Sequence, residues 1–219
     1  MKINLYIADA QGVFSDEEHK KIQSGVRRAE EYTVSKLAIS ENVDLIITPE
    51  LPDFLIPEDY LGGRTYTGNF ILVSLAAGHV DEDFVYEVIC HELCHASRWQ
   101  KNEEEMKNLF DGMILEGLAV YFEEQAMKNQ KNKQFFLRAM LERDNQENAE
   151  ILERLRGNLD EKYYDYYSIF ILGDKEKNIP RWSGYSVGHY LVKKYLEKTG
   201  KTIEEAFAEP FDNFRTILE

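Results

Sequence analysis

The chain has 219 residues, of which 43% are hydrophobic and 12% aromatic, so it can bury the core of one compact domain, which excludes disorder over most of its length. Lys and Arg together number 26 and Asp and Glu number 40, giving a net charge of −14 at pH 7. A field of that sign repels phosphate backbones and anionic lipid headgroups, so neither nucleic acid nor a membrane is an expected partner.

Targeting signals are weak throughout the sequence. The longest nearly apolar run, residues 70–80, is far shorter than the roughly 20 residues that a spanning helix needs, and residues 1–12 lack the pattern of a signal peptide. The two cysteines, Cys90 and Cys94, are four residues apart on a predicted helix, a geometry that disfavours a disulfide between them. We therefore expect reduced thiols and a cytoplasmic protein.

The first third of the chain alternates between strand and helix patterns. A first strand is predicted over Ile3–Ala8, and a second over Val43–Thr48. Between them, Ser15 followed by Glu18 has the spacing of a capping box, which predicts a helix from there to about Ala38. This order is typical of a helix packed on a small sheet.

A loop and a third strand follow. Pro52, Pro57, Gly62 and Gly63 predict the loop. The β-branched and aromatic residues of Thr65–Leu75 predict the strand, and its part from Gly68 onward is a candidate edge strand for pairing with an extended peptide.

Helical periodicity dominates after Asp81. The predicted helices are Glu82–Arg98, Glu104–Lys128, Gln134–Glu142, Ala149–Leu155, Ser183–Lys198 and Ile203–Ala208. We therefore expect an α+β fold in a single domain, 1–219, with a sheet-containing lobe over 1–80 and a helical lobe over 81–219 that carries the metal site described next.

The segment His91-Glu92-Leu93-Cys94-His95 has the H-E-x-x-H pattern. On a helix the two histidines lie one turn apart on one face, where both imidazoles can bind a single Zn²⁺. Glu92 points about 100° away, too far round the helix to bind with them but suitably placed to hold a water molecule. The alternative is a pair of core histidines satisfied by hydrogen bonds.

A third ligand is needed to distinguish these two interpretations, and Glu116 is the candidate. It lies within the apolar run 113–122, where an unpaired carboxylate would be costly to bury and a metal ion would remove that cost. The alternative is a glutamate on a helix surface beside Glu123 and Glu124.

The order His91-Glu92-x-x-His95, then Glu116 with Gly117, resembles the gluzincin class of zinc metallopeptidases. The resemblance implies a zincin-like fold, with one Zn²⁺ held by His91, His95 and Glu116 in a cleft between the lobes. The segment 184–188 looks like the helix that carries an oxyanion-binding tyrosine in the aminopeptidase branch, which implies that role for Tyr185. Over most of residues 65–195 the chain is similar to a small, uncharacterised bacterial family of predicted zinc-dependent proteases.

The sequence departs from the larger gluzincins in two places. The region 63–74 contains no acid, whereas the aminopeptidase branch has one there to hold the substrate amino terminus. Val120 occupies the position of the aspartate that orients a zinc-binding histidine in the thermolysin branch, which leaves Asp111 and Glu123 as candidates for that task.

Together these features predict a zinc peptidase that acts on peptide or protein substrates, with Glu92 as general base and Tyr185 stabilising the oxyanion. His189 is a lesser candidate beside Tyr185. Two other functions stay open. One is a catalytically silent zinc-binding module for protein interaction, and the other is a metal-free helical interaction domain whose motif is accidental.

Overall fold

The computed structural model describes residues 1–49, 55–101 and 106–218. The chain forms two compact units, of which the first comprises residues 1–103 and 122–137 and the second comprises 104–121 and 138–219. The first contains a four-stranded sheet and the second is built from helices, so the predicted α+β class is confirmed. Among the described residues, no helix combines the length and apolar character that crossing a membrane requires.

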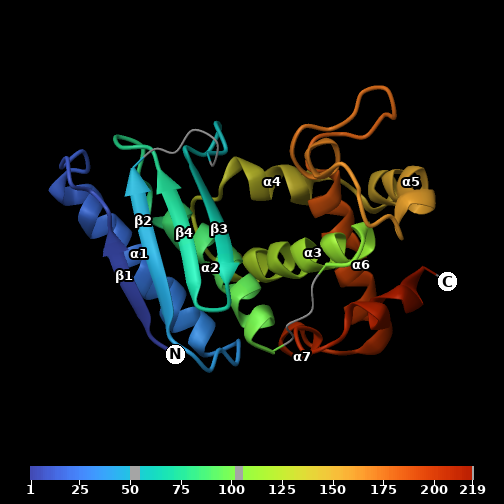
Figure 1. Cartoon of the computed structure of the whole chain (residues 1–219), viewed down its shortest axis with the longest axis horizontal. Helices are drawn as coiled ribbons and strands as arrows, with labels where there is room; N and C mark the ends of the chain where they lie inside the picture. Colours follow the sequence, from blue (N-terminus) through green and yellow to red (C-terminus); the bar gives the residue numbers. More distant parts are fainter. Residues whose placement is uncertain (50–54, 102–105, 219) are drawn as a thin grey trace. The chain divides into compact units, whose positions relative to one another are not determined.

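The sheet of the first unit has the strand order β1-β2-β4-β3 (Figure 1). Its strands are β1 (Ile3–Ile7), β2 (Val43–Pro49), β3 (Leu61–Thr67) and β4 (Phe70–Leu75). β1, β2 and β4 are parallel, whereas β3 runs antiparallel to β4, and β1 and β3 form the two edges of the sheet.

Helices α1 (Asp16–Val34) and α2 (Glu82–Lys101) pack against each other behind the sheet in Figure 1. Alternate residues of β2, Val43, Leu45 and Ile47, are fully buried, as a strand with one covered face requires. Ser15 and Glu18 form the predicted capping box at the start of α1. The helix ends at Val34 rather than near Ala38, because the chain turns at Ser35, whose hydroxyl donates to the carbonyl of Tyr32.

The predicted single strand Thr65–Leu75 is wrong in extent. A turn at Gly68 and Asn69 divides it into β3 and β4, and both residue types favour tight turns. β3 also includes Gly62 and Gly63, which were predicted to lie in a loop. Pro52 of that predicted loop lies outside the described residues.

The edge strand is therefore not the predicted one. β4, which corresponds to the candidate from Gly68 onward, lies between β2 and β3 and has both backbone edges paired. β1 and β3 are the two edge strands of this sheet, and Leu61 of β3 is also bridged to Ile56.

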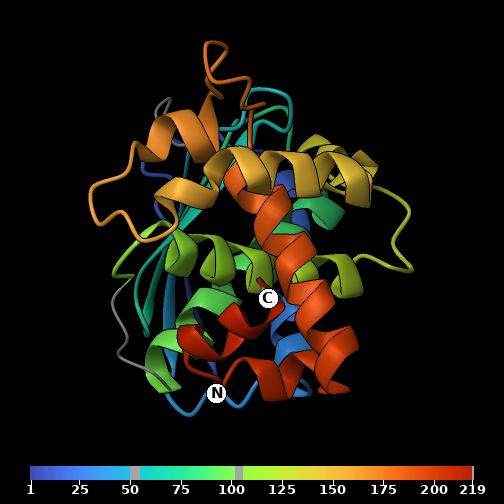
Figure 2. The same ribbon diagram turned by 90° about the vertical axis from the view of Figure 1, so that its right-hand side faces the viewer.

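The second unit centres on α6 (Ser183–Thr199), which packs against α5 (Asn145–Leu155); α5 crosses α6 in Figure 2. The remaining elements are α3 (Leu109–Ala126), α4 (Phe135–Glu142), α7 (Ile203–Ala206), the 3-10 helices Arg156–Asn158 and Phe211–Ile217, and a π-helical turn at Tyr167–Ile171. α3 and α4 are continuous helices that each contribute residues to both units. The predicted start of α3, Glu104, lies outside the described residues.

Candidate metal centre

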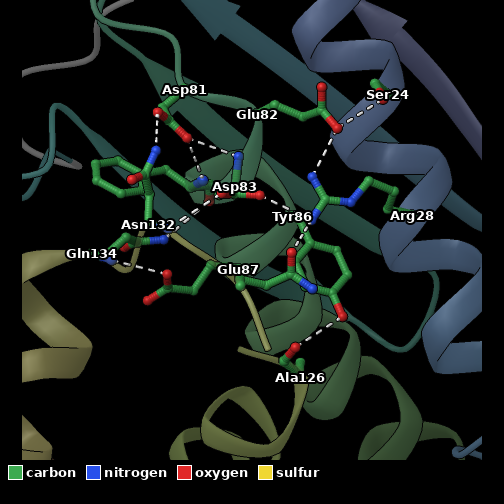
Figure 3. Close-up of polar contacts among 12 residues, drawn as sticks. Ser24, Arg28, Asp81, Glu82, Asp83, Tyr86, Glu87, Ala126, Asn132 and Gln134 are labelled. Atoms are coloured by element: carbon green, nitrogen blue, oxygen red, sulfur yellow. Dashed lines mark hydrogen bonds and ion pairs between the residues drawn. The ribbon is translucent and has the colours of Figure 1, made fainter. Parts of the chain in front are cut away.

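The helix that carries the H-E-x-x-H motif is anchored at its N-terminal end by a polar network (Figure 3). Arg28 of α1 donates to Glu82 at 2.7 Å, to Asp83 at 2.9 Å and to Gln130 at 2.7 Å. Its guanidinium also lies over the ring of Tyr86, 4.7 Å from the ring centroid. These contacts hold α2 against α1 and therefore fix where the motif lies in the first unit.

His91 and His95 lie one turn apart on α2, with ring centroids 4.9 Å apart. His91 is only 9% exposed. His95 is half-buried, so the two histidines lie on a largely covered face of the helix.

Glu123 orients the first histidine. Its Oε2 lies 2.8 Å from Nδ1 of His91, and its side chain is 2% exposed. When the carboxylate accepts from Nδ1–H, the imidazole is held in the tautomer whose Nε2 can bind a metal. Of the two candidates for this contact, Glu123 is therefore the one that lies beside the motif. Asp111 instead accepts a hydrogen bond from the backbone amide of Lys107, just before α3.

Glu87 is a further buried acid beside the motif, which the H-E-x-x-H pattern does not include. Burial, and next the charge of neighbouring Glu123, raise the pKa of Glu87. The backbone amide of Gln134 donates to Glu87 Oε2 at 2.9 Å. Glu87 lies four residues before His91, so helical spacing alone places it on the same helix face as that histidine.

Glu92, the expected general base, is 5% exposed. The hydroxyl oxygen of Thr65, on β3, lies 2.8 Å from Glu92 Oε2 and 2.9 Å from the Glu92 carbonyl oxygen. Glu92 therefore contacts β3, one of the two edge strands of the sheet.

Glu116 lies on α3 and is 9% exposed. One potential ligand atom from each of His91, His95 and Glu116 lies within 4.8 Å of the other two. Two imidazole nitrogens and one carboxylate oxygen form a donor set of the kind that binds zinc in hydrolases and leaves a coordination position open. The residues present thus fit the expected ion.

The neighbours of Glu116 in the second unit pack unusually closely. A Cβ added to Gly117 would lie 2.2 Å from the carbonyl carbon of Gly188, so α3 and α6 meet backbone to backbone. On α6, the hydroxyl of Tyr185 lies 3.1 Å from that of Tyr166, and its ring packs edge-on against Phe170. The role of Tyr185 at the oxyanion stays a prediction.

Cys90, Cys94 and His189 complete the set of residues that the sequence brings into question at this site. Cys90 and Cys94 are free thiols and both are buried. Burial raises the pKa of both, which makes them poor nucleophiles and poor metal ligands. His189 lies beside Tyr121, with ring centroids 5.8 Å apart.

The donor set and the buried carboxyl group of Glu92 beside it place this protein in the class of candidate zinc hydrolases. A family model described as predicted Zn-dependent protease (DUF2268) matches residues 22–216, and the chain belongs to this family. Comparison with curated proteins gave no match, and comparison with solved structures gave none either.

Proposed function

We propose that this protein is a zinc-dependent peptidase that holds one Zn²⁺ with His91, His95 and Glu116 and hydrolyses peptide bonds with Glu92 as general base. The observation that carries the proposal is the donor set, one ligand atom from each of the three residues within 4.8 Å of the others. Membership of the predicted Zn-dependent protease family supports the same chemistry.

Zinc, when bound, would lower the pKa of a coordinated water toward about 7 and polarise the scissile carbonyl. Glu92 would accept a proton from the attacking water and later deliver it to the amine that leaves. Glu123 would keep His91 in the required tautomer through its contact with Nδ1. Tyr185 would donate from its hydroxyl to the oxyanion that develops on the substrate.

The substrate would be a peptide or an unfolded protein segment. An extended segment can pair with the edge of a sheet through main-chain hydrogen bonds, and β3 is one of the two edge strands, with Leu61 at its start bridged to Ile56.

The test compares the wild type with Glu92→Gln and Glu116→Ala, all purified without added metal. Zinc content is measured by mass spectrometry and hydrolysis with fluorescein-labelled casein. We expect about one zinc per chain in the wild type and in Glu92→Gln, and much less in Glu116→Ala. Glu92→Gln should lose hydrolysis by about 10²- to 10⁴-fold, because general acid–base catalysis contributes that much.

Each other outcome removes one part of the proposal. Unchanged zinc in Glu116→Ala would exclude Glu116 as a ligand. Equal hydrolysis by the wild type and Glu92→Gln would exclude Glu92 as the base. Zinc binding without any hydrolysis of casein would favour a catalytically silent zinc-binding module.

A further inference from the structure

The carboxyl group of Glu92 is enclosed on two sides by one short segment of β3. Thr65 and Gly63 are two residues apart on this strand, so they share one face of it. Thr65 contacts Glu92 through its hydroxyl, and Gly63 lies close to Glu92 because it has no side chain.

The contact from Thr65 is a hydrogen bond. The hydroxyl has a single proton and two acceptors in range, the Oε2 of Glu92 at 2.8 Å and the carbonyl oxygen of the same residue at 2.9 Å. The hydroxyl of Thr65 therefore holds both Oε2 and the backbone of Glu92 against β3.

The contact at Gly63 is steric. A Cβ at this position would lie 2.7 Å from both Cγ and Oε1 of Glu92 and 3.0 Å from Cδ, and these are the three nearest atoms. Real Cβ atoms do not approach that closely, so only glycine leaves room for the observed rotamer of Glu92.

We infer that Gly63 and Thr65 of β3 are positioning residues, which together lock the carboxylate of Glu92 in the orientation that its role as general base requires. A glutamate side chain has several rotamers, and a misplacement of 1 Å at a reacting group can cost about 100-fold in rate. This inference rests on the proposed function, since it assigns the device that holds the proposed base.

The first experiment needs no substrate. The melting temperature, Tm, is measured for Thr65→Val and Gly63→Ala, each in the wild type and in Glu92→Ala. Both substitutions should lower Tm when Glu92 is present, and both should have little effect when it is absent, because the lost partner and the clash belong to that side chain. Equal Tm shifts in both backgrounds would overturn the inference.

The second experiment uses casein hydrolysis and zinc content. Thr65→Val should lower kcat by about 10- to 100-fold, with KM and bound zinc unchanged. Thr65→Ser should recover most of the lost kcat because it restores the hydroxyl. Thr48→Val on β2 is the control, since the hydroxyl of Thr48 donates to the carbonyl of Pro49 on its own strand, and its kcat should equal that of the wild type.

The two levels of the proposal fail differently. If Glu92→Gln is inactive and Thr65→Val is as active as the wild type, the positioning role is wrong and the proposed function stands. If Glu92→Gln is as active as the wild type, the proposed role of Glu92 as base is wrong, and positioning of a base is overturned with it even if the Tm experiment shows the contact.

Discussion

Removal of the Glu123 carboxylate should weaken zinc binding without removing a zinc ligand. Oε2 of Glu123 lies 2.8 Å from Nδ1 of His91, and the carboxylate is almost completely buried. In Glu123→Ala the imidazole loses the acceptor that fixes both its tautomer and its orientation. The free energy of zinc binding should therefore become less favourable, while both histidines and Glu116 remain in place.

The expected size follows from the type of contact. Loss of a hydrogen-bonding partner behind a metal-binding histidine costs about 10- to 100-fold in affinity, or about 1.4–2.8 kcal/mol. A buried hydrogen bond to a charged group is worth a similar amount, about 1.5–3 kcal/mol. Glu123→Gln should lose less than Glu123→Ala, because the amide oxygen can still accept from Nδ1–H.

The assay is competition for zinc with a chromophoric chelator of known affinity, after circular dichroism has shown that each variant is folded. Glu17→Ala provides the matched control, because it removes one negative charge from a side chain that is 79% exposed on α1. Its zinc affinity should equal that of the wild type. Folded Glu123→Ala with wild-type affinity would refute the reasoning, and so would an equal loss in the control, which would point to overall charge.

Two further substitutions test packing and buried charge. Gly188→Ala should lower Tm strongly, because its Cβ would lie 2.0 Å from the carbonyl oxygen of Met113. Gly157→Ala, which has no atom within 4 Å of the added Cβ, should not lower Tm, and equal Tm values for the two variants would contradict the close helix crossing. Glu87→Gln should raise Tm at pH 7 and change it little near pH 4, because burial and the charge of Glu123 raise the pKa of Glu87. When folding raises the pKa of an acid, the folded protein becomes less stable as pH rises above the pKa of that acid in the unfolded chain. A Tm difference between Glu87→Gln and the wild type that does not grow with pH would contradict the raised pKa of Glu87.

The features that the sequence predicted best are local to one helix. The capping box at Ser15 and the helix around the H-E-x-x-H motif depend on residues within one or two turns, and the structure contains both. Glu123 was only one of two candidates, although helical geometry favours it. It follows Glu116 by seven residues, which returns to within about 20° of the same face, whereas Asp111 precedes Glu116 by five residues and lies on a different face.

The contact between Glu92 and β3 could not be predicted because it depends on strand register. The β-branched and aromatic pattern of residues 65–75 predicts one strand, whereas a turn within it makes β3 a separate strand at one edge of the sheet. A Gly-Asn pair between two runs of strand-forming residues is itself a hairpin signal.

Register decides more than the position of the turn. Successive strand residues point to opposite faces, so a shift of β3 by one residue would replace Gly63 and Thr65 with Arg64 and Tyr66 against Glu92. Neither of those side chains offers both the space and the hydroxyl contact that the carboxylate has now. The motif on α2 thus supplies the reacting groups, while the register of a separate hairpin decides whether the proposed base is held in a usable orientation.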